Sequence, residues 1–224
     1  MISCIADVLT PEELKQFREV VGSAQFVDGK ETAGPRAKRV KNNEQISKTD
    51  QSRRKLQEMV VAALYRNPEF RRSAMPHRIR PPLISRYRPG MSYGLHVDDA
   101  LMGPLEARDR SDVSVTVFIS DVGEYEGGEL VIHTPYGMQE IKLPSGHLVA
   151  YPSSSLHEVT PVTAGERLVS VTWVQSYIRD EKQREALSDL AIIRNKLNTL
   201  APSAPETDLA FRLHTNLMRL WTET

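Results

Sequence analysis

Apolar residues recur with two periods along the chain, a helical period near both ends and a strand-like period in the middle. From about residue 79 to residue 177, short apolar runs alternate with turns that contain glycine or proline, which is typical of β-strands. The predicted strands cover residues 83–88, 92–97, 113–120, 129–134, 138–143, 147–151, 158–162 and 168–177. Strands at this spacing predict an all-β core, most economically a double-stranded β-helix, the cupin-like jelly roll.

Helical patterns flank this core on the N-terminal side. Thr10 and Glu13 have the spacing of a capping box, and an apolar stripe over residues 14–21 follows them. A second stripe over residues 56–64 ends at residues 67–68, where the sequence is Asn-Pro. The chain is therefore expected to be mainly β with flanking helices, an α+β arrangement. Residues 1–77 are expected to form an N-terminal helical region that packs on the core domain, residues 78–178.

Two further helices are predicted in a C-terminal region, residues 179–224. The first covers residues 180–198, and the second begins near Glu206 after a proline-containing break. The apolar side chains of the last helix form one stripe, composed of Leu209, Leu213, Leu217, Leu220 and Trp221. Such a stripe must be covered. The β core is the favoured cover, and a second copy of the chain, giving a homo-oligomer, is the alternative.

Residues 28–47 show little periodicity and are rich in lysine and arginine. One interpretation is a solvated basic loop. The other is a substrate-facing segment in which Lys41, Asn42 and Asn43 reach a functional pocket, because functional residues concentrate on loops.

Composition excludes several classes of protein. Lys+Arg and Asp+Glu number 29 each, so no net charge favours binding to nucleic acid or to a membrane surface. No apolar run approaches the ~20 residues that span a bilayer. The N-terminus lacks the pattern of a signal peptide, and Cys4 is the single cysteine. A cytoplasmic location is therefore expected.

His96 and Asp98 are the first candidate functional residues. They are two apart at the end of a predicted strand, so both side chains point to the same face and can bind one metal ion. Asp99 is the alternative carboxylate, although it would point away unless the strand bulges. A lone His-x-Asp pair is common, and a third ligand is needed to make the prediction specific.

His157 is the preferred third ligand because it follows a turn and precedes a strand that leads toward Arg167. His133 and His147 are the alternatives. Two histidines and one carboxylate on one face of an octahedral ion leave three positions open, as in non-haem Fe(II) oxygenases.

Arg167 lies ten residues beyond His157 and is the candidate residue for binding a molecule that fills those open positions on the metal. Together with Val169, Val171 and Trp173 it occupies one face of a predicted strand, so it is expected to point inward. A buried arginine needs an anion. Its planar guanidinium suits the far carboxylate of a 2-oxo diacid whose near end chelates the metal.

Longer motifs surround these residues over nearly the whole chain. They are Arg86-Tyr87, residues 93–98 (Tyr-Gly-Leu-His-Val-Asp), residues 126–130 (Glu-Gly-Gly-Glu-Leu), residues 151–157 (Tyr-Pro-Ser-Ser-Ser-Leu-His) and residues 173–176 (Trp-Val-Gln-Ser). This combination resembles the bacterial PKHD-type hydroxylases, relatives of prolyl and lysyl hydroxylases in the Fe(II)/2-oxoglutarate dioxygenase superfamily. The resemblance implies His96, Asp98 and His157 as iron ligands, Arg167 as the 2-oxoglutarate anchor and Tyr87 as a hydrogen-bond donor to that cosubstrate. It also implies binding of L-ascorbate and a link to iron homeostasis.

The predicted activity is an oxidoreductase that uses molecular oxygen and 2-oxoglutarate to hydroxylate a small-molecule or peptidyl substrate. One rival is a zinc-dependent hydrolase, since His2Asp and a water also form a catalytic zinc site. That reading leaves Arg167 unexplained. The other rival is a non-enzymatic iron or 2-oxoglutarate sensor with the same pocket.

Overall fold

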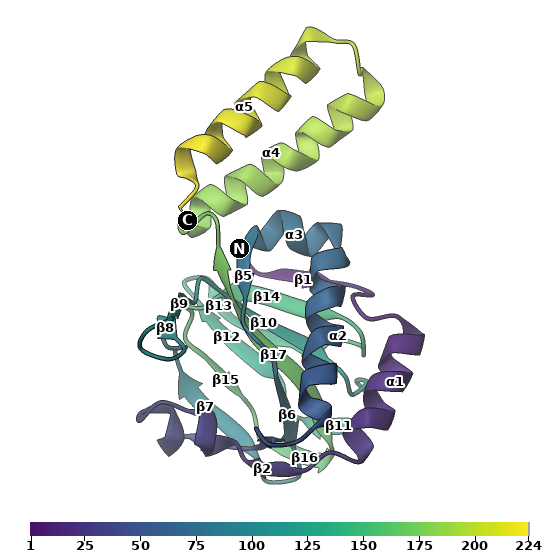
Figure 1. The fold of residues 1–224 in the computed structure, drawn as a ribbon, viewed down its shortest axis with the longest axis vertical. Coiled ribbons are helices and arrows are strands. Elements are labelled where there is room, and N and C mark those ends of the chain that lie inside the picture. The colour runs from purple at the N-terminus through teal and green to yellow at the C-terminus, as the bar shows by residue number, and fades with distance from the viewer. Residues whose placement is uncertain (224) are drawn as a thin grey trace.

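Two β-sheets form the body of the protein in a computed structural model, which describes residues 1–223 (Figure 1). The larger sheet has eight strands, in the order β1-β14-β10-β17-β6-β4-β2 with β5 beside β17. Its strands are β1 (Ser3–Ile5), β2 (Phe26–Asp28), β4 (Glu44–Ile46), β5 (Pro76–Ile79), β6 (Leu83–Tyr87), β10 (Val113–Phe118), β14 (Leu148–Pro152) and β17 (Arg167–Ser176).

The smaller sheet has five strands, in the order β13-β12-β15-β7-β3. They are β3 (Lys41–Asn42), β7 (Ser92–His96), β12 (Leu130–Thr134), β13 (Gly137–Ile141) and β15 (His157–Val159). Two short ribbons complete the β structure: β8 (Leu101–Met102) with β9 (Asp109–Arg110), and β11 (Tyr125–Gly127) with β16 (Val162–Gly165). The predicted jelly roll is confirmed. The predicted strand over residues 158–162 divides into the end of β15 and the start of β16.

Alternation along each strand decides what each face of the larger sheet contacts. In β10, Val113, Val115 and Val117 belong to the core shared with the helices, whereas Ser114 and Thr116 line an internal cavity between the sheets. Successive side chains of a strand point to opposite faces, so one strand serves both purposes.

Three helices cover the outer face of the larger sheet (Figure 1): α1 (Pro11–Gly22), α2 (Ser52–Arg66) and α3 (Pro68–Ala74). The predicted capping box of α1 is present, because Glu13 N–H donates to Thr10 Oγ1 and Thr10 N–H donates to Glu13 Oε2. Helix α3 was not predicted. Asn67 ends α2 and also caps α3, where its side chain accepts a hydrogen bond from Phe70 N–H, so an Asn-Pro step that stops one helix starts the next.

Residues 28–47 are not an unstructured loop. Besides two short 3₁₀ helices, Gly29–Thr32 and Ala37–Arg39, they contribute β3 to the smaller sheet and β4 to the larger one. This segment therefore links the two sheets. The division of the chain at residues 77 and 178 remains a prediction, and strands β1 to β4 show that residues 1–77 supply part of both sheets.

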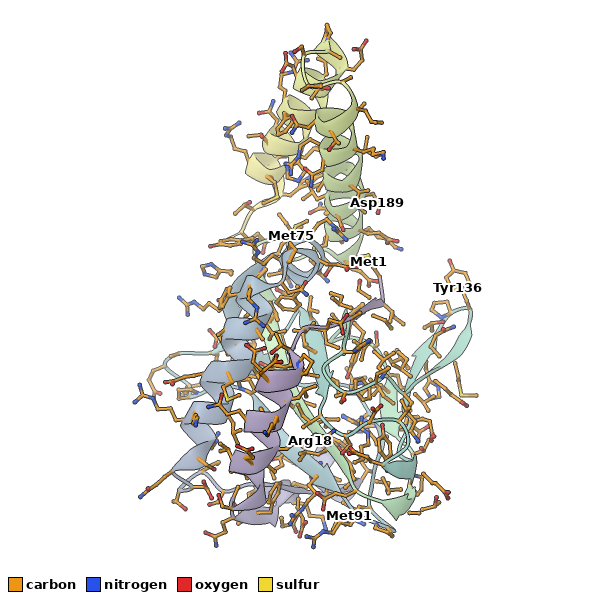
Figure 2. All side chains as sticks on the ribbon, turned by 90° about the vertical axis from the view of Figure 1, so that its right-hand side faces the viewer. Met1, Arg18, Met75, Met91, Tyr136 and Asp189 are labelled. Atoms are coloured by element: carbon orange, nitrogen blue, oxygen red, sulfur yellow. The ribbon has the colours of Figure 1, made fainter. Side chains whose placement is uncertain are left out.

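The C-terminal helices α4 (Glu181–Leu200) and α5 (Pro205–Trp221) form a hairpin that projects away from the β body (Figures 1 and 2). Only its base is packed, with Leu187 of α4 against Met75 and Ile178. The expectation that these helices cover the β core is therefore wrong: the stripe is left partly exposed, with Leu209 and Leu213 about half exposed. Among the described residues, no helix combines the length and the apolar character that crossing a membrane requires.

Candidate active site

A cavity of about 680 Å³ lies between the two sheets and is lined by residues of both. Its walls include all five residues predicted to be functional: Tyr87, His96, Asp98, His157 and Arg167. The volume is within the range of small-molecule sites in proteins. One cavity thus brings together residues that are up to 80 positions apart in the sequence.

His96 and His157 come from neighbouring strands of the smaller sheet. Strands β7 and β15 pair in antiparallel register, with His157 directly opposite His96, and their imidazole centroids are 4.3 Å apart. Asp98 follows two residues after β7 ends. Its carboxylate oxygens lie 4.0 Å from His96 Nε2 and 3.8 Å from His157 Nε2. The three ligand atoms lie within 4.8 Å of one another, close enough to hold one metal ion.

Backbone carbonyls fix the orientation of both imidazoles. The Nδ1 atom of His96 lies 2.8 Å from the Gly94 carbonyl oxygen, and that of His157 lies 2.9 Å from the Ser155 carbonyl oxygen. A carbonyl only accepts, so each Nδ1 carries the proton and each Nε2 keeps a free lone pair directed toward Asp98. Burial, followed by the neighbouring His157, lowers the pKa of His96 to about 4, which keeps that ring neutral near pH 7. Neutral imidazoles are the form that binds metals.

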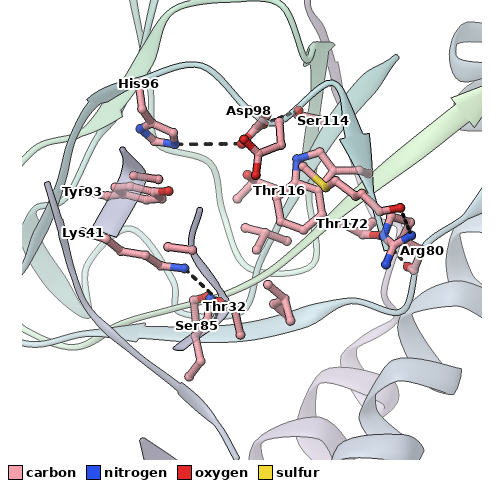
Figure 3. A pocket seen from close by; sticks show the side chains of 18 of the residues that line it. Thr32, Lys41, Arg80, Ser85, Tyr93, His96, Asp98, Ser114, Thr116 and Thr172 are labelled. Atoms are coloured by element: carbon pink, nitrogen blue, oxygen red, sulfur yellow. Dashed lines mark hydrogen bonds and ion pairs between the residues drawn. The ribbon is translucent and has the colours of Figure 1, made fainter. Parts of the chain in front are cut away.

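Ser114 positions the Asp98 carboxylate (Figure 3) and was not among the predicted site residues. Its hydroxyl lies 2.6 Å from Asp98 Oδ2 and 2.8 Å from Ser153 Oγ. A hydroxyl has one proton, so Ser114 donates to the carboxylate and accepts from Ser153. The signal was present in the sequence: residues 113–117 read Val-Ser-Val-Thr-Val, with polar side chains on the face that points inward.

The structure separates the alternative ligands from this cluster. Asp99 is exposed, at the mouth of the cavity. His133 faces Glu158, with Nε2 and Oε1 3.6 Å apart, and does not line the cavity. His147 lies in the turn before β14, also outside the cavity. The geometry therefore agrees with the choice of Asp98 and His157.

Arg167 is almost completely buried, with 1% of its surface exposed. Among residues 1–223, no carboxylate lies within 4.0 Å of its guanidinium, and its Nε has no hydrogen-bond partner. Its Cζ lies 5.1 Å from the ring centroid of Tyr87, its cross-strand partner, and 5.6 Å from that of Phe118. A buried cation without a protein anion is costly, so the site is built to receive an anion.

Gly128 leaves the space that the Arg167 side chain occupies. An added Cβ would lie 2.9 Å from Arg167 Cδ and 2.9 Å from Val162 Cγ2, and the φ of Gly128 is +67°. This close approach explains the second glycine of the Gly-Gly motif.

Replacing Gly128 with alanine is expected to destabilise the protein by about 1–3 kcal/mol, because backbone strain and crowding act together. Gly90→Ala is the matched control, since Gly90 has φ of +85° but no atom within 4 Å of an added Cβ. Urea unfolding of both variants measures the difference. Equal stability of the two variants would mean that the Arg167 side chain moves aside without cost.

Tyr87 and Tyr125 flank Arg167 and are both buried. Burial raises the pKa of both hydroxyls, with Arg167 opposing the shift, so both remain protonated hydrogen-bond donors near neutral pH. The Tyr125 hydroxyl has no protein partner among the described residues. The family resemblance implies Tyr87, whereas Tyr125 was not singled out.

Lys41 also lines the cavity, as the pocket-facing interpretation of residues 28–47 predicted. It is paired with Tyr93 across β3 and β7, and the Tyr93 ring stacks on His96 at 3.6 Å between centroids. Burial lowers the pKa of Lys41 to about 8, against the opposing effect of Asp98 and Asp28. Asn43 lines the cavity too, whereas Asn42 is exposed and donates to the Gly90 carbonyl.

Comparison with known proteins places this site in a family. A PKHD-type hydroxylase of Synechococcus sp. (strain JA-2-3B'a(2-13)) is 46% identical over 223 residues, and the similarity covers 100% of both chains. A second, from Acaryochloris marina, is 47% identical over the same length, again with 100% of both chains covered. The chain belongs to the PKHD-type hydroxylases. Residues 82–175 of this hydroxylase also match the 2OG-Fe(II) oxygenase superfamily.

Solved structures support the fold of the hydroxylase. A Pseudomonas putida prolyl-4-hydroxylase matches with a TM-score of 0.51 and 18% identity, covering 78% of this chain and 92% of that one. A Trichoplax adhaerens prolyl hydroxylase, solved with a hypoxia inducible factor peptide fragment, matches with a TM-score of 0.56 and 18% identity, covering 84% and 86%. HygX from Streptomyces hygroscopicus, solved with nickel, 2-oxoglutarate and hygromycin B, matches with a TM-score of 0.53 and 14% identity, covering 79% and 84%.

Membership of this family makes the protein a 2-oxoglutarate-dependent dioxygenase and implies Fe(II) and 2-oxoglutarate as its cofactor and cosubstrate. The residues of the cavity fit both. Two imidazoles and a carboxylate are a suitable donor set for Fe(II), and no carboxylate among residues 1–223 lies within 4.0 Å of the Arg167 guanidinium. The family assignment argues against the interpretation of the site as a zinc-dependent hydrolase.

Proposed function

We propose that His96, Asp98 and His157 bind Fe(II) and that the protein hydroxylates a C–H bond of its substrate. The observation that carries the proposal is the convergence of these three side chains in the same cavity as a buried arginine that has no carboxylate within 4.0 Å among residues 1–223. The metal ligands are held ready by the Gly94 and Ser155 carbonyls and by Ser114. Orienting contacts of this kind fix the tautomer and the ring position of metal ligands.

We also propose that Arg167 binds the distal carboxylate of 2-oxoglutarate and that the Tyr87 hydroxyl donates a hydrogen bond to it. Arg167 is charged and buried, and Tyr87 is its cross-strand neighbour in β6, so both groups can reach one carboxylate. The low polarity around Phe118 and Val169 strengthens such a charge-assisted contact.

Fe(II) with 2-oxoglutarate supplies the oxidising chemistry: one O2 is consumed, 2-oxoglutarate becomes succinate and CO2, and one oxygen atom enters the substrate as a hydroxyl group. The chain's own residues bind and orient the reactants. L-ascorbate would keep the iron ferrous, and a role in iron homeostasis in the cytoplasm is part of the proposal. The substrate is a small molecule or a peptidyl residue.

The test is a screen of metabolites and peptides for succinate release by the Fe(II)-loaded protein. Substrate-dependent succinate formation, with one hydroxyl group added per succinate, supports the proposal. A protein that binds Fe(II) and 2-oxoglutarate but forms no succinate with any compound would instead be a sensor.

The C-terminal hairpin is proposed to bind a second copy of the chain. It projects from the body, and its exposed apolar side chains include Leu209, Leu213 and Leu220. Two identical hairpins that pack together would bury these stripes as a four-helix bundle does.

Deleting residues 201–224 is expected to convert an oligomer into a monomer. The double substitution Leu209→Glu with Leu213→Glu is a milder change and is expected to have the same effect. The charged side chains would prevent burial of the stripe. Mass in solution, measured by light scattering, distinguishes the species. An unchanged mass for both variants would show that the hairpin is not the contact.

A further inference from the structure

Lys41 is a buried cation that the iron and 2-oxoglutarate chemistry does not use. Only 5% of its surface is exposed, and among residues 1–223 no carboxylate lies within 4.0 Å of its ammonium group. Its one hydrogen-bond partner in the described part of the chain is Thr32 Oγ1, at 3.1 Å. An ammonium has three N–H donors, so two of them have no acceptor among these residues.

The neighbours of Lys41 hold it in place without neutralising it. The Thr32 hydroxyl lies 2.5 Å from Gln45 Oε1, and Gln45 Nε2 donates to Ser85 Oγ at 3.1 Å. This series of hydrogen bonds ties β4 and β6 of the larger sheet to the lysine of the smaller sheet. Its members are uncharged, so they position the ammonium and leave its charge unbalanced.

Lys41 and the candidate metal ligand His96 both lie against the Tyr93 ring. Figure 3 shows Tyr93 between His96 and Lys41, with its hydroxyl directed into the cavity. Lys41 Nζ lies 5.3 Å from the Tyr93 ring centroid, and that ring stacks on His96. A tyrosine hydroxyl is protonated near neutral pH and can donate a hydrogen bond. An anion bound between Lys41 and Tyr93 would accept hydrogen bonds from the ammonium group and from the hydroxyl group.

The positive charge of Lys41 is not needed to balance the charges of the proposed metal ion and cosubstrate. A ferrous ion held by His96, Asp98 and His157 would carry three positive charges together with Arg167, and Asp98 and the two carboxylates of 2-oxoglutarate would balance them. Lys41 would then be a buried cation without a counter-charge of its own, and a carboxylate of the substrate would supply one.

The cavity walls as a whole are also cationic, in a chain whose net charge is zero. They contain three carboxylates, of Glu31, Asp98 and Asp99, and six cationic side chains, of Lys41, Lys48, Arg53, Arg80, Arg108 and Arg167. Arg80 is paired with Asp109, but Lys48, Arg53 and Arg108 have no ion pair among the described residues. A cleft of one sign attracts ligands of the opposite sign.

We propose that the substrate carries a carboxylate and that Lys41 binds it beside the metal ligands, with Tyr93 as a second donor. This inference rests on the proposed function. It narrows the substrate class to carboxylic acids, including free amino acids and peptides that present a carboxylate.

The experiment titrates matched probes into anaerobic protein that holds Fe(II) and 2-oxoglutarate, following the charge-transfer absorbance of the metal chelate. The probes are L-amino acids, dipeptides with a free C-terminal carboxylate and simple monocarboxylic acids. The C-terminal amide of each compound and a phosphate ester series are the comparison. Acids are expected to perturb the absorbance, and their amides to bind at least about 30-fold more weakly, as for a truncated buried charge pair.

Lys41→Met is expected to lower the affinity for the acids by the same factor and to leave the affinity for the amides unchanged. Lys41→Arg is expected to keep part of the affinity for the acids. Lys142→Met is the matched control, since Lys142 also packs over a tyrosine ring, that of Tyr125 at 4.1 Å, but lies outside the cavity. The affinity of Lys41→Met for 2-oxoglutarate is expected to match that of the unaltered protein, which also shows that the variant is folded. Lys41→Gln replaces it if the methionine variant does not fold.

Several results would overturn the inference. They are equal binding of acids and amides, binding of no acid although 2-oxoglutarate binds normally, tighter Lys41-dependent binding of phosphates, or loss of 2-oxoglutarate affinity in Lys41→Met. The last result would assign Lys41 to the cosubstrate. Absence of any 2-oxoglutarate chelate in the unaltered protein is a separate outcome, which would contradict the proposed function itself.

Discussion

Replacing His157 with alanine is expected to abolish 2-oxoglutarate turnover, and His96→Ala and Asp98→Ala are expected to do the same. Two remaining ligands hold Fe(II) poorly and leave the wrong face of the ion open. The iron content of the purified variant and its rate of succinate formation are the quantities to measure. Both are expected to fall to background. The fold should survive, because the two apolar cores that flank the larger sheet do not include these side chains.

His147→Ala and His133→Ala are the matched controls for this loss. Both histidines lie outside the cavity, so both variants should keep iron and activity. Full activity in His157→Ala, or loss of iron in His147→Ala, would move the third ligand away from His157.

Arg167→Ala is expected to raise the 2-oxoglutarate requirement by roughly 30-fold to several thousand-fold, since truncating one partner of a buried charge pair costs about 2–5 kcal/mol. Iron binding should remain nearly intact, because Arg167 is not among the proposed metal ligands and lies in the other sheet. His96 and His157 belong to the smaller sheet and Asp98 follows it directly, whereas Arg167 belongs to the larger sheet. Arg167→Lys should recover only part of the affinity, because a point charge does not reproduce the planar fork of arginine.

Arg88→Ala is the control for Arg167→Ala. Arg88 follows Tyr87 at the end of β6, but its side chain is half exposed and lies outside the cavity. Its removal should leave 2-oxoglutarate binding unchanged. If Arg167→Ala binds 2-oxoglutarate as well as the unaltered protein does, another basic residue is the anchor.

The convergence of His96 and Asp98 was predictable because local rules govern it. His96 and Asp98 are two apart at a strand end, and the inward face of the last strand could be read from Arg167, Val169 and Val171. The choice of His157 needed more, because it depends on which strands pair. The register that places His157 opposite His96 is a long-range property that was not predicted. The choice of His157 depended on the turn before it, on the strand that leads toward Arg167 and on the motif resemblance.

The predictions failed where tertiary contacts override local pattern. Residues 28–47 lack periodicity because β2, β3 and β4 have two or three residues each, too few for an alternation to show. The C-terminal helices were expected to lie on the core because their stripe is apolar. The structure packs only the base of the hairpin, and amphipathicity shows that a face needs a partner without showing which one.

The most direct test of the whole account is a titration of 2-oxoglutarate into anaerobic Fe(II)-loaded protein, following the charge-transfer absorbance of the chelate. The account predicts that the absorbance develops to one equivalent in the unaltered protein. It also predicts no chelate in His157→Ala and a large shift of the titration to higher concentration in Arg167→Ala. Failure of the unaltered protein to form the chelate, or titrations in both variants that match it, would contradict the account.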